Sequence, residues 1–347
     1  FYNLSQLIFP IKDNHLGFYQ IPNYDNYKNK EKIDSFIQTK EFLDYPAYKI
    51  NIDSLKNELA KKPADSVEGI YQYGKFYSIG LFKIYDKEYV GVIVDSEVNL
   101  WQKGQIAIHL YQYAPNMFKA IYSHPKYKFF ILKTNEKYKN QSLINSYFYS
   151  SFSQDIYSKQ VRPVDYVNLP KNTLKFDLKN INDNFQYLLL RSFQRNNTTI
   201  QHSANFYDSI KNILTAKNLI LDLRNNEGGA AKEANKYFKL LKKHSKNGHL
   251  YVLLNNETMS QAEIFTLRLK KLKNVTTVGQ TTKGMLAYGS NYGKWERLPS
   301  GLFEIYLTDM RGKSRLLQYE DHGINPEIIL HDDKDWIEQV VDIIQKK

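Results

Sequence analysis

The sequence has no cysteine, little glycine and proline, and no long hydrophobic run. The absence of cysteine excludes a disulfide framework, a thiolate nucleophile and a cysteine-ligated zinc site. With 16 Gly and 10 Pro among 347 residues, a collagen-like or low-complexity chain is also excluded. No stretch approaches the roughly 18 apolar residues that a membrane-spanning helix needs, so we expect no membrane span in this chain. The start at Phe1, without a signal peptide, predicts a trimmed or mature chain and is compatible with a removed membrane anchor.

Aromatic residues are abundant, with 28 Tyr, 19 Phe and 3 Trp. A chain with so many large apolar side chains can bury enough surface to fold, and its length predicts about two domains. The formal net charge of +12 would fit a nucleic-acid-binding protein. However, the basic residues are scattered, and the densest cluster, Lys236–Lys246, places Leu240 and Leu241 among lysines at helical spacing. This pattern is typical of a solvated amphipathic helix, so we expect no nucleic-acid partner.

The first part of the chain divides into a polar segment and a β-rich module. Residues 1–65 are expected to form a small N-terminal segment. Residues 66–140 contain β-rich runs, separated by turns, at 74–84, 88–96, 104–113, 117–124 and 127–134. Short strands at this spacing predict an antiparallel meander or a small barrel. The alternating aromatics of the module, such as Tyr71, Tyr73 and Tyr77, are typical of the inward face of a barrel.

The remaining residues, 141–347, alternate between short apolar runs and amphipathic segments. Strands are predicted at 185–193, 218–224, 249–256 and 275–279, and helices at 206–216, 230–243, 261–272 and 335–347. This order predicts βαβ units around a parallel sheet. The fold class is therefore α/β, with an inserted antiparallel β module.

In open α/β sheets, functional sites form beyond the carboxyl ends of the strands, and two strand–helix junctions carry candidate residues. The first junction has Gly228 and Gly229 before a helix. This pair either lets backbone amides bind an anion or only forms a tight turn. At the second junction Ser260 begins a helix, with Glu263 three residues later. The S-x-x-E pattern is typical of a capping box, and the alternative is a nucleophile beside the positive end of a helix.

Four segments, in the right order, resemble the C-terminal-processing, or tail-specific, serine peptidases, a family that includes the tricorn core protease and the interphotoreceptor retinoid-binding protein repeats. LILDLRNNEGG resembles D-L-R-x-N-x-G-G, and TMSQAEIF resembles the segment S-A-S-A-S-E, with Ser260 at the nucleophile position. VTTVGQTTKGM resembles V-x-G-E-x-T-x-G, and YEDHGINPEI resembles E-x-x-G-I-x-P-D. The resemblance covers about residues 185–330 and implies the crotonase-like (ClpP/crotonase) fold for a peptidase domain at 141–347.

The two branches of this family use different bases to activate the serine. One branch uses a downstream lysine, but the matching position here is Met285, and Lys283 lies two residues earlier. The tricorn-like branch uses a histidine from an upstream D-G-H-T/S segment. IKDNHLGFY resembles that segment at Asp13 and His15 and departs from it at the residue after each. The resemblance therefore implies His15 as the base.

A late glutamate of the tricorn-like branch helps to orient the histidine–serine pair. In the YEDHG segment the matching residue is Glu320, and His322, two residues later, is the rival base. The expected oxyanion hole consists of the backbone amide of Gln261 and that of Gly228 or Gly229. No His or carboxylate cluster has a metal-ligand spacing such as H-E-x-x-H, so we expect neither a metal nor a cofactor.

The function that the resemblance implies is hydrolysis of peptide bonds in unfolded proteins or peptides, outside the cytoplasm of a bacterium, in the periplasm or at the cell surface. Two alternatives stay open. Departures from the family pattern, such as Asn14 and Met285, favour a catalytically inactive peptidase-like binding protein. The shared fold also leaves room for an acyl-CoA enzyme, because fold alone does not establish function.

Overall fold

The computed structural model describes residues 1–148, 155–160, 164–290, 293–310 and 312–346. By its internal contacts the chain forms two compact units. Unit 1 comprises Phe1–Val161 and Ser290–Asp309, and unit 2 comprises Arg162–Gly289 and Met310–Lys347. The expected segments 1–65 and 66–140 both lie in unit 1, and their boundaries stay a prediction. No helix among the described residues is long and apolar enough to cross a bilayer.

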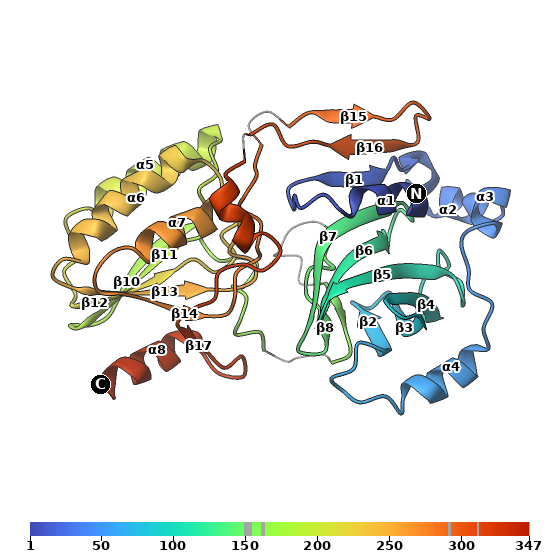
Figure 1. Ribbon diagram of the computed structural model, residues 1–347, viewed down its shortest axis with the longest axis horizontal. Helices are drawn as coiled ribbons and strands as arrows, with labels where there is room; N and C mark the ends of the chain where they lie inside the picture. Colours follow the sequence, from blue (N-terminus) through green and yellow to red (C-terminus); the bar gives the residue numbers. More distant parts are fainter. Residues whose placement is uncertain (149–154, 161–163, 291–292, 311, 347) are drawn as a thin grey trace. The chain divides into compact units, whose positions relative to one another are not determined.

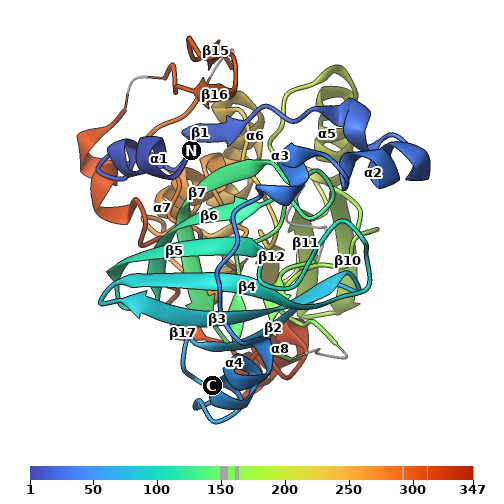
Figure 2. The same cartoon turned by 90° about the vertical axis from the view of Figure 1, so that its right-hand side faces the viewer.

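Unit 1 is built on one antiparallel sheet that closes into a barrel. Its elements are α1 (Tyr2–Ile8), β1 (Gly17–Gln20), the 3₁₀ helix η1 (Tyr24–Tyr27), α2 (Lys30–Phe36), α3 (Lys40–Leu43), α4 (Ile52–Leu59), β2 (Gly69–Tyr73), β3 (Tyr77–Tyr85), β4 (Glu88–Ser96), β5 (Ile106–Ala114), β6 (Met117–Ser123), β7 (Phe130–Lys139), β8 (Ser142–Leu143), β9 (Tyr157–Ser158), β15 (Trp295–Arg297) and β16 (Phe303–Tyr306). The sheet order is β15-β16-β1-β7-β6-β5-β4-β3-β2-β9-β8, and β7 also pairs with β8, which closes the ring. Figure 2 looks onto strands β3–β7 of this barrel. The antiparallel β module that the sequence predicts is thereby confirmed.

Aromatic side chains fill the barrel because alternate residues of each strand point inward. Tyr71, Tyr73 and Tyr77 are each no more than 3% exposed and belong to the main core of this unit. Their inward orientation agrees with the prediction from the sequence. Phe76, in the turn between β2 and β3, is 45% exposed, because it lies outside the alternation of either strand.

A lysine is buried in the same aromatic core. Lys128 is 4% exposed, and its Nζ lies 3.6 Å from the ring centroid of Trp101 and 3.8 Å from that of Tyr45. Its Nζ also donates hydrogen bonds to Leu100 O at 3.1 Å and to Gln105 Oε1 at 2.7 Å. Burial nevertheless lowers the pKa of Lys128 to about 6, since the low-dielectric interior disfavours the charged form.

The lowered pKa of Lys128 predicts a pH-dependent stability. Between pH 6 and 10.5 the unfolded chain holds a proton that the folded chain has released, so the free energy of unfolding rises with pH. Relative to Lys128→Met, the wild type should gain up to about 1.4 kcal/mol per pH unit. Urea denaturation of both proteins at pH 6.5 and 8.5 measures this difference. A difference that does not change with pH would mean that the folded protein keeps this proton.

Unit 2 is an α/β layer with a mostly parallel sheet. Its elements are β10 (Phe176–Asn182), β11 (Phe185–Leu190), α5 (Asn197–Ile210), β12 (Asn218–Asp222), α6 (Ala231–His244), β13 (His249–Leu254), α7 (Gln261–Leu269), β14 (Val275–Gly279), the 3₁₀ helix η2 (Ser314–Tyr319), β17 (Ile328–Ile329) and α8 (Trp336–Gln345). The sheet order is β10-β11-β12-β13-β14-β17, in which only β10 runs antiparallel to its neighbour. The α/β class is confirmed.

The central strands of unit 2 are short, continuous apolar runs because both faces of the sheet are covered. Figure 1 shows α5, α6 and α7 on one face and α8 on the other. Leu219 and Leu221 of β12 and Leu250 and Val252 of β13 are fully buried and belong to the core under α6 and α7. The carboxyl ends of β12 and β13 therefore lie side by side, and both candidate junctions follow them.

One predicted helix has different bounds. The sequence predicts a helix over 206–216, whereas α5 runs from Asn197 to Ile210. The helix begins early because the Asn196 side chain caps it, accepting a hydrogen bond from Thr199 N at 2.9 Å. After Ile210 the chain turns, and Ile213 is 51% exposed.

Candidate active site

Ser260 lies in a strained turn between β13 and α7. Its backbone has φ +56° and ψ −121°, a conformation that residues with a side chain rarely adopt. Such strain costs on the order of 1–3 kcal/mol and is retained where the surrounding structure enforces it, often at functional sites. A sharp strand-to-helix turn of this kind presents a serine hydroxyl at the edge of a sheet, as nucleophile turns do.

The first junction packs directly against this turn. Gly228 has φ +86°, and a Cβ on it would lie 2.9 Å from Gln261 N, Met259 O and Ser260 Cβ. Met259 N donates to Asn226 O at 3.0 Å, which ties the residue before Ser260 to the glycine loop. Only a residue without a side chain fits at Gly228.

Among the residues that the structure describes, two backbone N–H groups at this junction have no hydrogen-bond acceptor. Gly228 N donates to Asn226 Oδ1 at 2.9 Å, so its N–H is already used. Within the described ranges, the N–H groups of Gly229 and Gln261 make no hydrogen bond. Gln261 N is the first amide of α7 and carries the positive end of the helix dipole. Gly229, rather than Gly228, is therefore the glycine whose amide is available to an oxyanion.

The loop that carries the glycines is held by buried polar groups. Arg224 Nη2 lies 2.7 Å from Asp222 Oδ2, and both side chains are nearly inaccessible to solvent. Tyr187 Oη donates to the same oxygen at 2.9 Å. Asn226 Nδ2 donates to Leu190 O at 2.7 Å, which anchors the loop on β11. The D-L-R-x-N part of the motif is thus structural support for the glycine turn.

Glu263 joins the serine turn to the loop that follows β14. Its Oε2 accepts hydrogen bonds from Ser260 N at 3.0 Å and Met285 N at 2.9 Å. Its Oε1 accepts from Thr282 Oγ1 at 2.6 Å and Gly284 N at 2.9 Å. Burial raises the pKa of Glu263, and these donors oppose the rise. The capping interpretation of S-x-x-E is therefore supported. The same serine can cap the helix and still have the strained backbone that a nucleophile turn has.

The structure also places the two rival bases. Lys283 is buried, and its Nζ lies 3.3 Å from Glu257 Oε2, so a carboxylate already engages this ammonium. His322 is exposed. The choice among the candidate bases stays a prediction.

Glu320 is buried, at 2% exposure, after η2. Its Oε2 accepts hydrogen bonds from Leu286 N and Ala287 N, both at 2.9 Å. Glu320 therefore fixes the segment that follows Met285. Ser260, Gln261, Gly228, Gly229 and Glu320 all belong to unit 2.

His15 belongs to unit 1, in the turn between α1 and β1. Its backbone N donates to Asp13 Oδ1 at 2.9 Å, and Thr308 Oγ1 donates to Asp13 Oδ2 at 2.7 Å. Asp13 thus holds the turn, as an aspartate does at the start of many turns. Burial lowers the pKa of His15, and the Asp13 charge opposes this. The pairing of His15 with Ser260 stays a prediction.

Comparison with known proteins finds one matching family model. The model of Peptidase family S41 matches residues 184–246 and 231–328. These residues include both junctions, Ser260 and Glu320. No curated protein matches the chain significantly.

The comparison with solved structures finds distant matches. A lipoprotein from Streptococcus agalactiae has 19% identity and a TM-score of 0.34 over 49% of this chain and 69% of that chain. The tricorn protease has 16% identity and a TM-score of 0.35 over 47% and 18%. The photosystem II D1 C-terminal processing protease has 14% identity and a TM-score of 0.33 over 94% and 93%. Matches this distant carry no functional argument, so the assignment depends on the family model. Residues 184–328 of this chain are therefore similar to peptidase family S41.

Proposed function

We propose that this chain is a serine peptidase that hydrolyses peptide bonds of unfolded proteins or peptides, with Ser260 as the nucleophile. The observation that carries the proposal is the Ser260 turn. A serine held at φ +56° lies next to two unengaged amides, those of Gly229 and Gln261. This combination is what acyl transfer requires, namely a nucleophile and preorganised donors for the oxyanion.

In the proposed reaction the Ser260 hydroxyl attacks the carbonyl carbon of the scissile peptide bond. The negative charge that develops on the carbonyl oxygen is stabilised by the N–H groups of Gly229 and Gln261. The loss of one such donor typically costs about 100–1000-fold in rate. The base passes the proton that it took from Ser260 to the leaving amine as the tetrahedral intermediate collapses. Water then hydrolyses the resulting acyl-enzyme.

The proposed general base is His15, on the strength of the sequence resemblance. A neutral imidazole is needed to take the serine proton, and burial lowers the pKa of His15, which favours the neutral ring. Glu320 is proposed to orient the histidine–serine pair. The anchoring of Glu320 by two backbone amides supports a fixed carboxylate at that position.

A covalent serine reagent tests the proposal. A fluorophosphonate should modify Ser260 in the wild type, as shown by peptide mapping, and fail to modify the Ser260→Ala variant. The matched control is Ser209→Ala, which removes an exposed serine of α5 and should leave labelling unchanged. Wild-type protein that is folded yet neither labelled nor able to hydrolyse casein would support the inactive binding protein instead.

A further inference from the structure

A pocket opens at the end of the unit 2 sheet opposite to Ser260. It has a volume of about 460 Å³, and Lys217 and Gly248 are among its lining residues. These two residues directly precede β12 and β13, whereas Ser260 follows the carboxyl end of β13. The six residues of β13 separate the two sites by about 20 Å.

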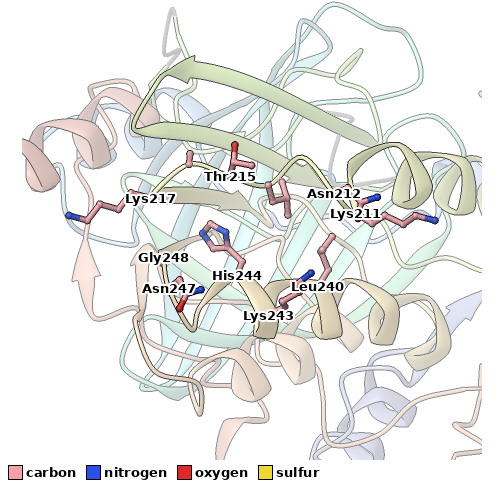
Figure 3. A pocket seen from close by; sticks show the side chains of 11 residues that line it. Lys211, Asn212, Thr215, Lys217, Leu240, Lys243, His244, Asn247 and Gly248 are labelled. Carbon is pink, nitrogen blue, oxygen red and sulfur yellow. The ribbon is translucent and has the colours of Figure 1, made fainter.

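The charged side chains that line this pocket all have the same sign. They are Lys211, Lys217 and Lys243, and no carboxylate lines the pocket. Lys211 is paired with Asp208 at 2.7 Å, but within the described ranges neither Lys217 nor Lys243 has an acidic partner. Figure 3 shows His244 in the middle of the pocket, with Lys217 and Lys211 at opposite sides. Burial lowers the pKa of His244, so the lysines supply the positive charge.

The pocket continues into a second, less polar hollow. Asn212 and Thr215 line both, and the second hollow, of about 410 Å³, adds Leu178 and Ile213. Ile213 is 51% exposed. The two hollows together are called the basic groove below. The first hollow offers cationic positions and the second offers apolar ones.

The wall of the basic groove is rigid. The buried side chain of Gln186 accepts hydrogen bonds from Thr215 N at 3.0 Å and Ala216 N at 3.1 Å. Its amide nitrogen donates to Ile213 O and to Asn180 Oδ1, both at 2.9 Å. The loop between α5 and β12 is thereby preorganised, which lowers the entropic cost of binding.

We propose that the basic groove binds an acidic segment of a polypeptide, in which carboxylates meet Lys217 and Lys243 and an apolar side chain packs on Leu178 and Ile213. Charge complementarity supports this occupant. A lone phosphate fits less well, because it would leave the apolar positions at Leu178 and Ile213 unused.

Equilibrium binding to the Ser260→Ala protein tests the proposal without any requirement for catalysis. The probe is a fluorescein-labelled 12-residue peptide that alternates Glu with Leu or Ser, followed by fluorescence anisotropy. We expect saturable binding that the double variant Lys217→Glu/Lys243→Glu weakens by about tenfold or more, since like charges then face each other. The same peptide with Lys in place of Glu should not bind.

The matched control reverses one charge at the opposite end of the same helix. Lys232 is exposed in the first turn of α6, and 11 residues separate it from Lys243, or about 16 Å along the axis. Lys232→Glu should leave the affinity within twofold. Equal weakening by Lys232→Glu would reveal non-specific attraction to the net charge and overturn the proposal. Competition by inorganic phosphate at low millimolar concentration would show a small-anion site and overturn the proposal. Absence of peptide binding would also overturn it.

Discussion

Casein hydrolysis is expected to fall by about 10⁴-fold or more when either Ser260 or His15 is replaced by alanine. Ser260→Ala removes the nucleophile from a turn that the fold has already strained. His15→Ala removes the proposed proton acceptor, and a serine hydroxyl without a base is a weak nucleophile. Because the two residues act as one unit, the double variant should be no slower than Ser260→Ala. Initial rates with fluorescein-labelled casein measure all three effects.

The matched control for His15→Ala is His322→Ala, which removes an exposed histidine and should keep wild-type activity. Full activity of His15→Ala beside an inactive Ser260→Ala would refute the assigned base. In that case Lys283→Met would be the next variant, measured together with its unfolding free energy, since it also breaks the buried contact with Glu257. Activity in the Ser260→Ala protein itself would refute the nucleophile.

The amino-acid sequence predicts the local elements of this chain well because their patterns are local. Strand β12 is a continuous apolar run, and α6 has its lysines on one side of a buried stripe. The closure of the barrel depends instead on β8 and β9, which are two residues long. Such short strands have no periodicity, and only long-range pairing with β7 and β2 defines them. For the same reason the addition of β16 to β1 could not be predicted.

The candidate site also has features that local sequence patterns predict and features that only the folded structure shows. Ser260 and the two glycines are recognisable from the order of motifs, but the choice between Gly228 and Gly229 depends on one side-chain hydrogen bond, from Gly228 N to Asn226. No spacing rule encodes which amide a side chain engages. The contacts of Glu263 outside the helix cap could not be predicted either, since S-x-x-E predicts only a cap. Its contacts with Gly284 and Met285 arise because the β14 loop returns to the serine turn.

Glu263→Gln is expected to destabilise the protein by about 2–6 kcal/mol, because two buried donors lose their acceptor. The Glu263 carboxylate accepts from Ser260 N, Thr282 Oγ1, Gly284 N and Met285 N. A glutamine of the same shape has one oxygen, so its NH₂ group must face two of these donors. Those donors would be buried and unsatisfied, which carries a desolvation penalty. Urea denaturation measures the change in unfolding free energy.

The substitution should also let the Ser260 backbone relax from its positive φ, because the hydrogen bond from Ser260 N to Glu263 helps to keep the backbone in that conformation. The fluorophosphonate labelling rate, measured where the variant is still fully folded, should therefore fall by about tenfold or more. Glu327→Gln makes the same atom exchange at a half-exposed pair with Lys270 and should change stability by less than about 1 kcal/mol. A destabilised variant with an unchanged labelling rate would mean that Glu263 stabilises the fold but does not affect the reactivity of Ser260. A stability loss similar to that of the control would contradict the proposed role of Glu263, since two buried donors cannot lose their acceptor without a measurable cost.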